Sequence, residues 1–158
     1  MDRHVRDAFL VLLADARICF DMTHNGLSIK WVKDTSEEVQ LAAVTEDYSA
    51  IYFIKNPSEQ VQRAAVTENW SVLEWLDDPS EEVQLAAVTQ NGFAIKWVDD
   101  PSEALQLLAV TQYGSAIEFI EDPCEAVQVA AVTTYGLALE YIENPCAATK
   151  AIKYWTPY

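Results

Sequence analysis

The sequence is poor in the residues that most enzymes use for catalysis and metal binding. Its 158 residues include two histidines, three cysteines and four glycines. His4 and His24 lie outside the regular part of the sequence, and neither has a second histidine or a cysteine at metal-ligand spacing. The sequence contains no glycine-rich phosphate loop, no G-x-S-x-G motif and no convincing Cys/His nucleophile pair. It therefore predicts a protein without catalytic activity, metal or cofactor.

Basic residues are also scarce, and long apolar runs are missing. Residues 34–145 hold 21 Asp or Glu and three Lys or Arg, a net charge of −18, whereas the two ends together carry +3. Such a charge repels nucleic acid and membrane surfaces and attracts basic proteins. No apolar run approaches the roughly 20 residues that a membrane span needs. We therefore expect neither direct nucleic-acid binding nor membrane association.

The N-terminus has some features of a secretory signal, namely early basic residues and the short apolar run Ala8–Ala14. Asp2 and Asp7 in or beside the charged region argue against a signal, and the run is at the lower limit of length. We favour a first, capping helix, because the end repeat of a stack must differ from the others.

The sequence is rich in repetition with a period of 22 residues, from PSEQVQRAAVTENWSVLEWLDD at 57–78 to PCEAVQVAAVTTYGLALEYIEN at 123–144. A fixed period of this size is typical of stacked-repeat architectures. Each copy carries helix signals: Asp or Asn as N-cap, Pro at the first helical position, and Glu at the third to complete a capping box. A glycine near the helix end, as at Gly92 or Gly114, would supply a left-handed stop.

A second, shorter helix such as 71–77 follows in each repeat. Its apolar positions predict a core column at Ile29, Ile51, Leu73, Ile95, Ile117 and Leu139. A second column is aromatic, and we interpret it as packing between repeats: Trp31, Phe53, Trp75, Trp97, Phe119 and Tyr141. Recurring glutamines and threonines in the long helix are interpreted as structural, with Thr bonding the carbonyl four residues back and Gln bridging turns.

The fold predicted is all-α: a right-handed α-solenoid of stacked two-helix 22-residue repeats with N- and C-terminal capping helices. Residues 1–158 form a single repeat domain. It divides into an N-terminal cap with a first degenerate repeat (1–33), five regular repeats (34–144) and a C-terminal cap (145–158).

The pattern V-x-x-A-A-V-x-x-N-G-x-A-I/L-x-Y/W-I/V-x-D/N-P covers about residues 35–146 and resembles short α-solenoid repeats. It is similar to leucine-rich-variant and HEAT-like repeats, and to uncharacterised Ala-Val-rich repeats of phages, large viruses and bacteria. The resemblance implies a macromolecule-binding solenoid. It brings no assigned chemistry.

Two surfaces are candidates for partner binding. The first is an acidic face on the short helices and the loops after them: Glu74, Asp77, Asp99, Glu118, Glu121, Glu140 and Glu143. The second is an apolar row on the outer side of the long helices: Leu41, Leu85, Leu107 and Val129. Arg63 interrupts this row, which indicates an exposed column.

Two functions follow from these surfaces. The acidic face favours a non-enzymatic inhibitor that mimics nucleic acid and occupies the basic groove of a DNA- or RNA-binding enzyme. Together with the acidic charge, the resemblance to phage repeats implies a phage counter-defence protein such as an anti-CRISPR or anti-restriction factor. The apolar row favours instead a protein–protein adaptor or scaffold.

Location and self-association are predicted from the cysteines and the C-terminus. Cys124 and Cys146 occupy the same place in successive repeats, where helices about 8–10 Å apart are too far separated for a disulfide. Reduced cysteines favour a cytoplasmic location, that of a host cell if the protein is phage-encoded. Tyr154, Trp155 and Tyr158 would either seal the last repeat or form a homodimer contact. The apolar row is the other candidate for a homodimer contact.

Overall fold

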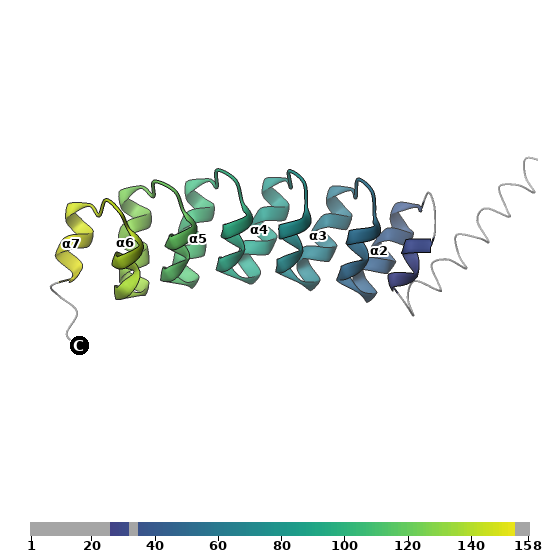
Figure 1. Ribbon diagram of the computed structural model, residues 1–158, viewed down its shortest axis with the longest axis horizontal. Coiled ribbons are helices and arrows are strands. Elements are labelled where there is room, and N and C mark those ends of the chain that lie inside the picture. The colour runs from purple at the N-terminus through teal and green to yellow at the C-terminus, as the bar shows by residue number, and fades with distance from the viewer. Residues whose placement is uncertain (1–25, 32–34, 154–158) are drawn as a thin grey trace, which may run out of the picture. The chain divides into compact units, whose positions relative to one another are not determined.

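The computed structural model describes residues 26–31 and 35–153, and every regular element in these residues is a helix (Figure 1). Six-residue 3-10 helices alternate with α-helices: η1 Gly26–Trp31, α2 Glu37–Glu46, η2 Tyr48–Phe53, α3 Glu59–Glu68, η3 Trp70–Trp75, α4 Glu81–Gln90, η4 Gly92–Trp97, α5 Glu103–Gln112, η5 Gly114–Phe119, α6 Glu125–Thr134, η6 Gly136–Tyr141 and α7 Ala147–Lys153. The predicted all-α solenoid of two-helix repeats is confirmed. The second helix of each repeat is a 3-10 helix.

The chain forms two compact units, residues 1–83 and 84–158, and the boundary between them falls in α4. In the first unit α2 packs on α3, while η2 packs on both η1 and η3. In the second unit α6 packs on α5 and α7, while η5 packs on η4 and η6. Each unit therefore consists of one layer of α-helices and one layer of 3-10 helices (Figure 1).

Several sequence-based predictions concern residues that the structure does not describe. The N-terminal cap falls largely on residues 1–25, and Tyr154, Trp155 and Tyr158 also lie outside the described residues. The assignment of residues 1–158 to one domain stays a prediction. The C-terminal cap is described only through α7.

The core of each unit lies between its two layers. Predicted core positions are buried in five of the six copies, namely Ile29, Ile51, Leu73, Ile95 and Ile117. Leu139, in the last copy, is half-buried. The α-helices α2 to α6 contribute a valine or leucine at their third position and an Ala-Val pair, as in Val61, Ala65 and Val66 of α3. Burial of these side chains is the main stabilising term.

The predicted start of each α-helix is wrong by two residues. Four of the predicted caps adopt left-handed backbone angles instead, with φ of 46° to 52° at Asn56, Asp78, Asp100 and Asp122. Asn and Asp tolerate this conformation better than other residues with a β-carbon. The caps are Ser58 and Ser102, whose Oγ atoms accept a backbone N–H three residues later at 3.4 Å. The proline thus precedes the cap, and glutamate occupies the first helical position.

The predicted left-handed glycine stop is also wrong, because no glycine among residues 26–31 and 35–153 has a positive φ. Glycine is required here by the next repeat: a β-carbon on Gly92 would lie 2.7 Å from the carbonyl oxygen of Ala109. The residue before it starts the 3-10 helix. Asn91 accepts a hydrogen bond from the backbone N–H of Phe93 at 3.0 Å, and Asn69 does the same for Ser71 at 2.9 Å.

The structural interpretation is confirmed for Thr111, and for the glutamines it holds in part, because Gln106 bonds within its own repeat and Gln128 forms the predicted bridge between repeats. The hydroxyl of Thr111 donates to the carbonyl of Leu107 at 2.6 Å, four residues back. Gln106 donates to the carbonyl of Pro101 at 2.8 Å, within its own repeat. Gln128 also joins two repeats, because its side-chain oxygen accepts the backbone N–H of Cys146 at 2.8 Å.

Candidate functional site

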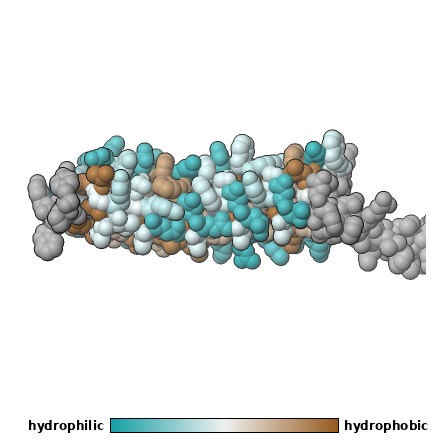
Figure 2. Space-filling model, turned by 90° about the horizontal axis from the view of Figure 1, so that it is seen from below, coloured by the Kyte–Doolittle hydropathy of each residue, from teal (hydrophilic) through white to brown (hydrophobic). Residues whose placement is uncertain are grey.

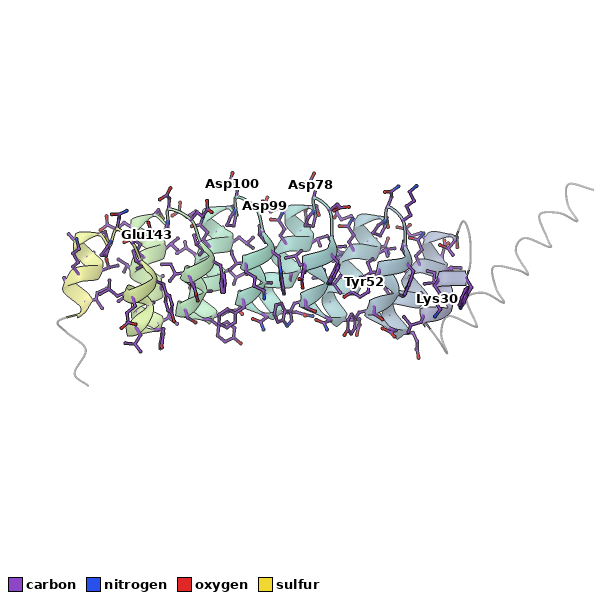
Figure 3. The ribbon with its side chains drawn as sticks, viewed as in Figure 1. Lys30, Tyr52, Asp78, Asp99, Asp100 and Glu143 are labelled. Atoms are coloured by element: carbon purple, nitrogen blue, oxygen red, sulfur yellow. The ribbon has the colours of Figure 1, made fainter. Side chains whose placement is uncertain are left out.

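All seven residues of the predicted acidic face are exposed. Glu74 and Asp77 belong to the first unit; Asp99, Glu118, Glu121, Glu140 and Glu143 belong to the second. No side-chain hydrogen bond or ion pair joins any of the seven carboxylates to another residue in the described part of the chain. Three come from 3-10 helices and four from the loops that follow them. In the second unit, Asp99, Asp100 and Glu143 lie along the loop edge (Figure 3).

The aromatic column is largely exposed, and the predicted packing between repeats is found for part of it. Trp75 contacts Tyr52, and Phe119 contacts Phe93, each a ring of the preceding repeat, with centroids 5.4 Å and 6.3 Å apart. Five of its six rings are exposed by 40% or more: Trp31 80%, Phe53 50%, Trp75 64%, Phe119 40% and Tyr141 43%. Each ring is the last residue of its 3-10 helix, where the chain leaves the packed interface. The surface is therefore a mixture of carboxylates and aromatic rings, and one face appears in Figure 2 with hydrophobic residues among hydrophilic ones.

At two rings of this column, the ammonium group of the preceding lysine lies over the ring. The Nζ atom of Lys96 lies 3.9 Å from the ring centroid of Trp97, and Nζ of Lys30 lies 5.1 Å from that of Trp31. Both distances are typical of cation–π interactions. The position before the ring is Glu in three other repeats, at Glu74, Glu118 and Glu140. The sequence predicted these glutamates as part of the acidic face, whereas the contacts of Lys30 and Lys96 with the rings that follow them were not predicted.

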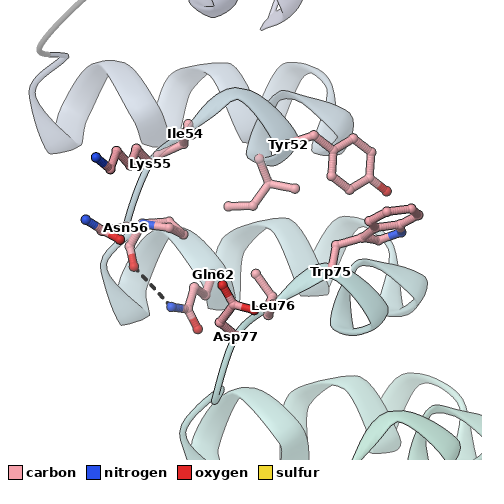
Figure 4. A pocket seen from close by; sticks show the side chains of 10 residues that line it. Tyr52, Ile54, Lys55, Asn56, Gln62, Trp75, Leu76 and Asp77 are labelled. Atoms are coloured by element: carbon pink, nitrogen blue, oxygen red, sulfur yellow. Dashed lines mark hydrogen bonds between the residues drawn. The ribbon is translucent and has the colours of Figure 1, made fainter.

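Each unit has a groove between successive repeats. The first-unit groove has a volume of about 830 Å³ and is lined by Tyr52, Lys55, Trp75 and Asp77 together with apolar side chains (Figure 4). The second-unit groove has a volume of about 520 Å³. Its lining includes Glu118, Glu121, Asp122, Tyr141 and Glu143. The two grooves use equivalent positions three repeats apart, so the difference between them is one of side chains.

Two aromatic rings that line the first-unit groove contact each other. Tyr52 and Trp75 meet in an edge-type contact with centroids 5.4 Å apart (Figure 4). Burial raises the pKa of Tyr52, and negative charge near it adds to the shift, so its hydroxyl stays neutral at physiological pH. Lys55 supplies a cation and Asp77 an anion at this groove.

The predicted apolar row is less exposed than the acidic face. Leu85 is 47% exposed, whereas Leu41, Leu107 and Val129 are half-buried. Arg63, in the same column, is exposed. The row therefore offers one prominent leucine rather than a continuous apolar strip.

Glu38, in the first turn of α2, has a lowered pKa. The pKa of Glu38 is lowered by a hydrogen bond from its own backbone N–H and then by one from the Ser36 side chain. A general acid needs the opposite shift. Within the described residues no group of three or more His, Cys, Asp or Glu could hold a metal ion.

Cys124 and Cys146 are free thiols. Cys146 precedes α7, and its sulfur accepts the backbone N–H of Thr149 at 3.5 Å, while the hydroxyl of Thr149 lies 3.3 Å away. Hydrogen bonding with the Thr149 side chain, and then with its backbone, lowers the pKa of the Cys146 thiol. The thiolate is thus present at lower pH than in a free cysteine.

We expect alkylation of Cys146 by iodoacetamide to have a lower pH midpoint than alkylation of an unperturbed thiol, because its pKa is lowered. In a background with serine at positions 19 and 124, Thr149→Val should move the midpoint upward, because the side-chain hydrogen bond is lost. The measurement is the alkylation rate as a function of pH. An unchanged midpoint in Thr149→Val would show that the hydroxyl does not stabilise the thiolate.

No protein-family model matches the chain, and searches of curated proteins and solved structures find no match either. In the residues that the structure describes, no helix has the length and apolar character needed to cross a membrane.

Proposed function

We propose that this chain is a non-enzymatic, acidic repeat protein that binds a protein partner with a basic surface and competes there with nucleic acid. The observation that carries the proposal is the set of seven exposed carboxylates at repeating positions, without partners among the described residues. Repetition on 3-10 helices and their loops holds the carboxylates at recurring positions within each unit. Held in this way, they lose less conformational freedom on binding than carboxylates on a flexible tail.

The target class that we propose is an enzyme that binds DNA or RNA. Such enzymes gather Lys and Arg in a groove that neutralises phosphates, and a fixed series of carboxylates would occupy the same cations. A counter-defence factor of a phage, acting in the cytoplasm of its host, would have this property. That last step is supported by the resemblance to repeats of phages and by the net charge of −15.

The proposal is tested by reversing three carboxylates of the second unit in the triple variant Asp99→Lys, Glu121→Lys and Glu143→Lys. The partner would be captured from a bacterial lysate enriched in nucleic-acid-binding enzymes, and its affinity measured at two salt concentrations. We expect loss of affinity of at least about a hundredfold in the variant, a steep salt dependence for the wild type, and displacement of the wild type by DNA or RNA.

The matched control is Glu46→Lys with Glu59→Lys and Glu68→Lys, which changes the net charge equally on the α-helices of the first unit. This control should retain most of the affinity if the acidic face is the binding surface. Intact binding of the Asp99/Glu121/Glu143 variant to the partner would rule out the inhibitor function.

An adaptor function is the second candidate, and it depends on the 47% exposure of Leu85. It would be a protein–protein scaffold that binds through the apolar row. In that case Leu85→Ala with Leu107→Ala would abolish binding, salt would have little effect, and the charge reversals would be tolerated.

A further inference from the structure

The second-unit groove differs from its first-unit equivalent in charge. Tyr52 and Lys55 of the first are replaced by Glu118 and Glu121 in the second. The described residues that line the second-unit groove include four acidic side chains and no basic one: Glu118, Glu121, Asp122 and Glu143. The second-unit groove is also smaller, with a volume of about 520 Å³ against about 830 Å³ in the first unit.

The second difference concerns the aromatic wall. In the first unit the ring of Trp75 is contacted by that of Tyr52 at 5.4 Å. The equivalent pair in the second unit is Tyr141 and Glu118, so Tyr141 has a carboxylate where Trp75 has a ring. Tyr141 is 43% exposed and lines the groove. Its ring is thus available to a planar cation that also pairs with carboxylates.

The same unit shows that this ring position accepts a cation. Lys96 lies 3.9 Å from the ring centroid of Trp97, which occupies the place of Tyr141 two repeats earlier. At the repeat of Tyr141 the lysine is replaced by Glu140. The chain therefore supplies a lysine beside Trp97, whereas the charged side chains that it supplies beside Tyr141 are carboxylates.

We propose that the second-unit groove binds the guanidinium group of an arginine in an extended basic segment of the partner. This inference rests on the proposed function and names the group recognised. Arginine fits better than lysine because its planar group stacks on a ring and donates along fixed directions to carboxylates on both sides. The base of the groove is fixed, since Gln128 donates to the carbonyl of Pro123 at 2.9 Å and accepts the N–H of Cys146 at 2.8 Å.

The test uses the full chain and a fluorescein-labelled hexa-arginine peptide, with binding measured by fluorescence anisotropy at moderate salt. We expect Glu118→Gln with Glu121→Gln to weaken binding by about tenfold, and Tyr141→Leu by about fivefold. Tyr141→Phe should bind as the wild type does, because the ring is kept. Unchanged thermal unfolding shows that each variant is folded.

Two controls separate a specific groove from general attraction. Glu59→Gln with Glu68→Gln removes the same charge from α3 and should weaken binding by less than about twofold, and Trp75→Leu removes a ring from the other groove with a similarly small effect. Equal losses in these controls and in the groove variants would overturn the groove as the binding site. Equal affinity for hexalysine would overturn the choice of arginine.

The outcome also distinguishes the two proposals. Absence of hexa-arginine binding to the wild type would overturn the arginine groove. The inhibitor function would still be tested by the Asp99/Glu121/Glu143 variant with a folded basic partner. Conversely, tight and groove-dependent peptide binding that DNA does not compete with in a ternary assay would support the groove and contradict the inhibitor function.

Discussion

Replacing Gly114 by alanine is expected to lower the free energy of unfolding by about 2–4 kcal/mol, one of the largest effects available from a single methyl group. A β-carbon at this position would lie 2.6 Å from Cβ of Tyr135 and 2.9 Å from its backbone nitrogen, and it would also clash with the carbonyl oxygen of Ala131. Two of these atoms are backbone atoms of the next repeat. The repeat must therefore move, because no flexible side chain can make the space.

The control for this prediction is Gly136→Ala, the same change one repeat later. A β-carbon on Gly136 would have no neighbouring atom within 4 Å, and no described glycine has a positive φ. This variant should therefore be neutral, or gain about 0.4–1 kcal/mol because the unfolded chain loses freedom. Urea unfolding followed by far-ultraviolet circular dichroism measures both. Equal stability of the two variants would show that glycine is not required by repeat packing.

The architecture could be predicted from the sequence because period and burial repeat together. A 22-residue copy with apolar residues at fixed positions leaves few ways to bury them other than stacking. The core column follows from the same pattern, since Leu73, Ile95 and Ile117 occupy identical places and are all buried. Local propensity and repeat packing agree at these positions.

The starts and ends of the helices were harder to predict because one residue type is compatible with two backbone geometries. Asp100 followed by Pro101 is compatible both with a helix cap and with a left-handed turn before the real cap, and the structure has the turn. Gly92 likewise suits a left-handed stop, yet it is required by Ala109, seventeen residues later in the chain. A contact over that distance is set by packing and leaves no local signal.

The candidate site was predicted in part. The exposure of the acidic residues follows from their charge, whereas the exposure of rings such as Trp75 and Tyr141 was not expected, because an aromatic residue in a repeat usually packs on its neighbour. Their position at the end of a 3-10 helix turns them outward. The 3-10 helix ends where the chain leaves the packed interface between repeats. The sequence of a six-residue segment does not show where that point lies.

A graded truncation of Ile117 is expected to have the second large effect on stability. Ile117 is 1% exposed in η5, which packs on η4 and η6. Ile117→Val should cost about 0.5–1.5 kcal/mol, and Ile117→Ala about 2–5 kcal/mol, because the larger deletion leaves a cavity between close-packed layers. The urea midpoint should fall in the same order with little change in the slope of the transition.

Leu137→Ala is the matched control, since Leu137 belongs to the neighbouring η6 and is 55% exposed. Its removal should change the free energy of unfolding by no more than about 0.5 kcal/mol. A loss at Leu137 as large as that at Ile117 would mean that the 3-10 layer buries a different face from the one described. A small loss at both would mean that the α-helices stabilise the unit without the 3-10 layer. The acidic and aromatic face would then be mobile, and its carboxylates and rings could not be held in fixed positions for a partner.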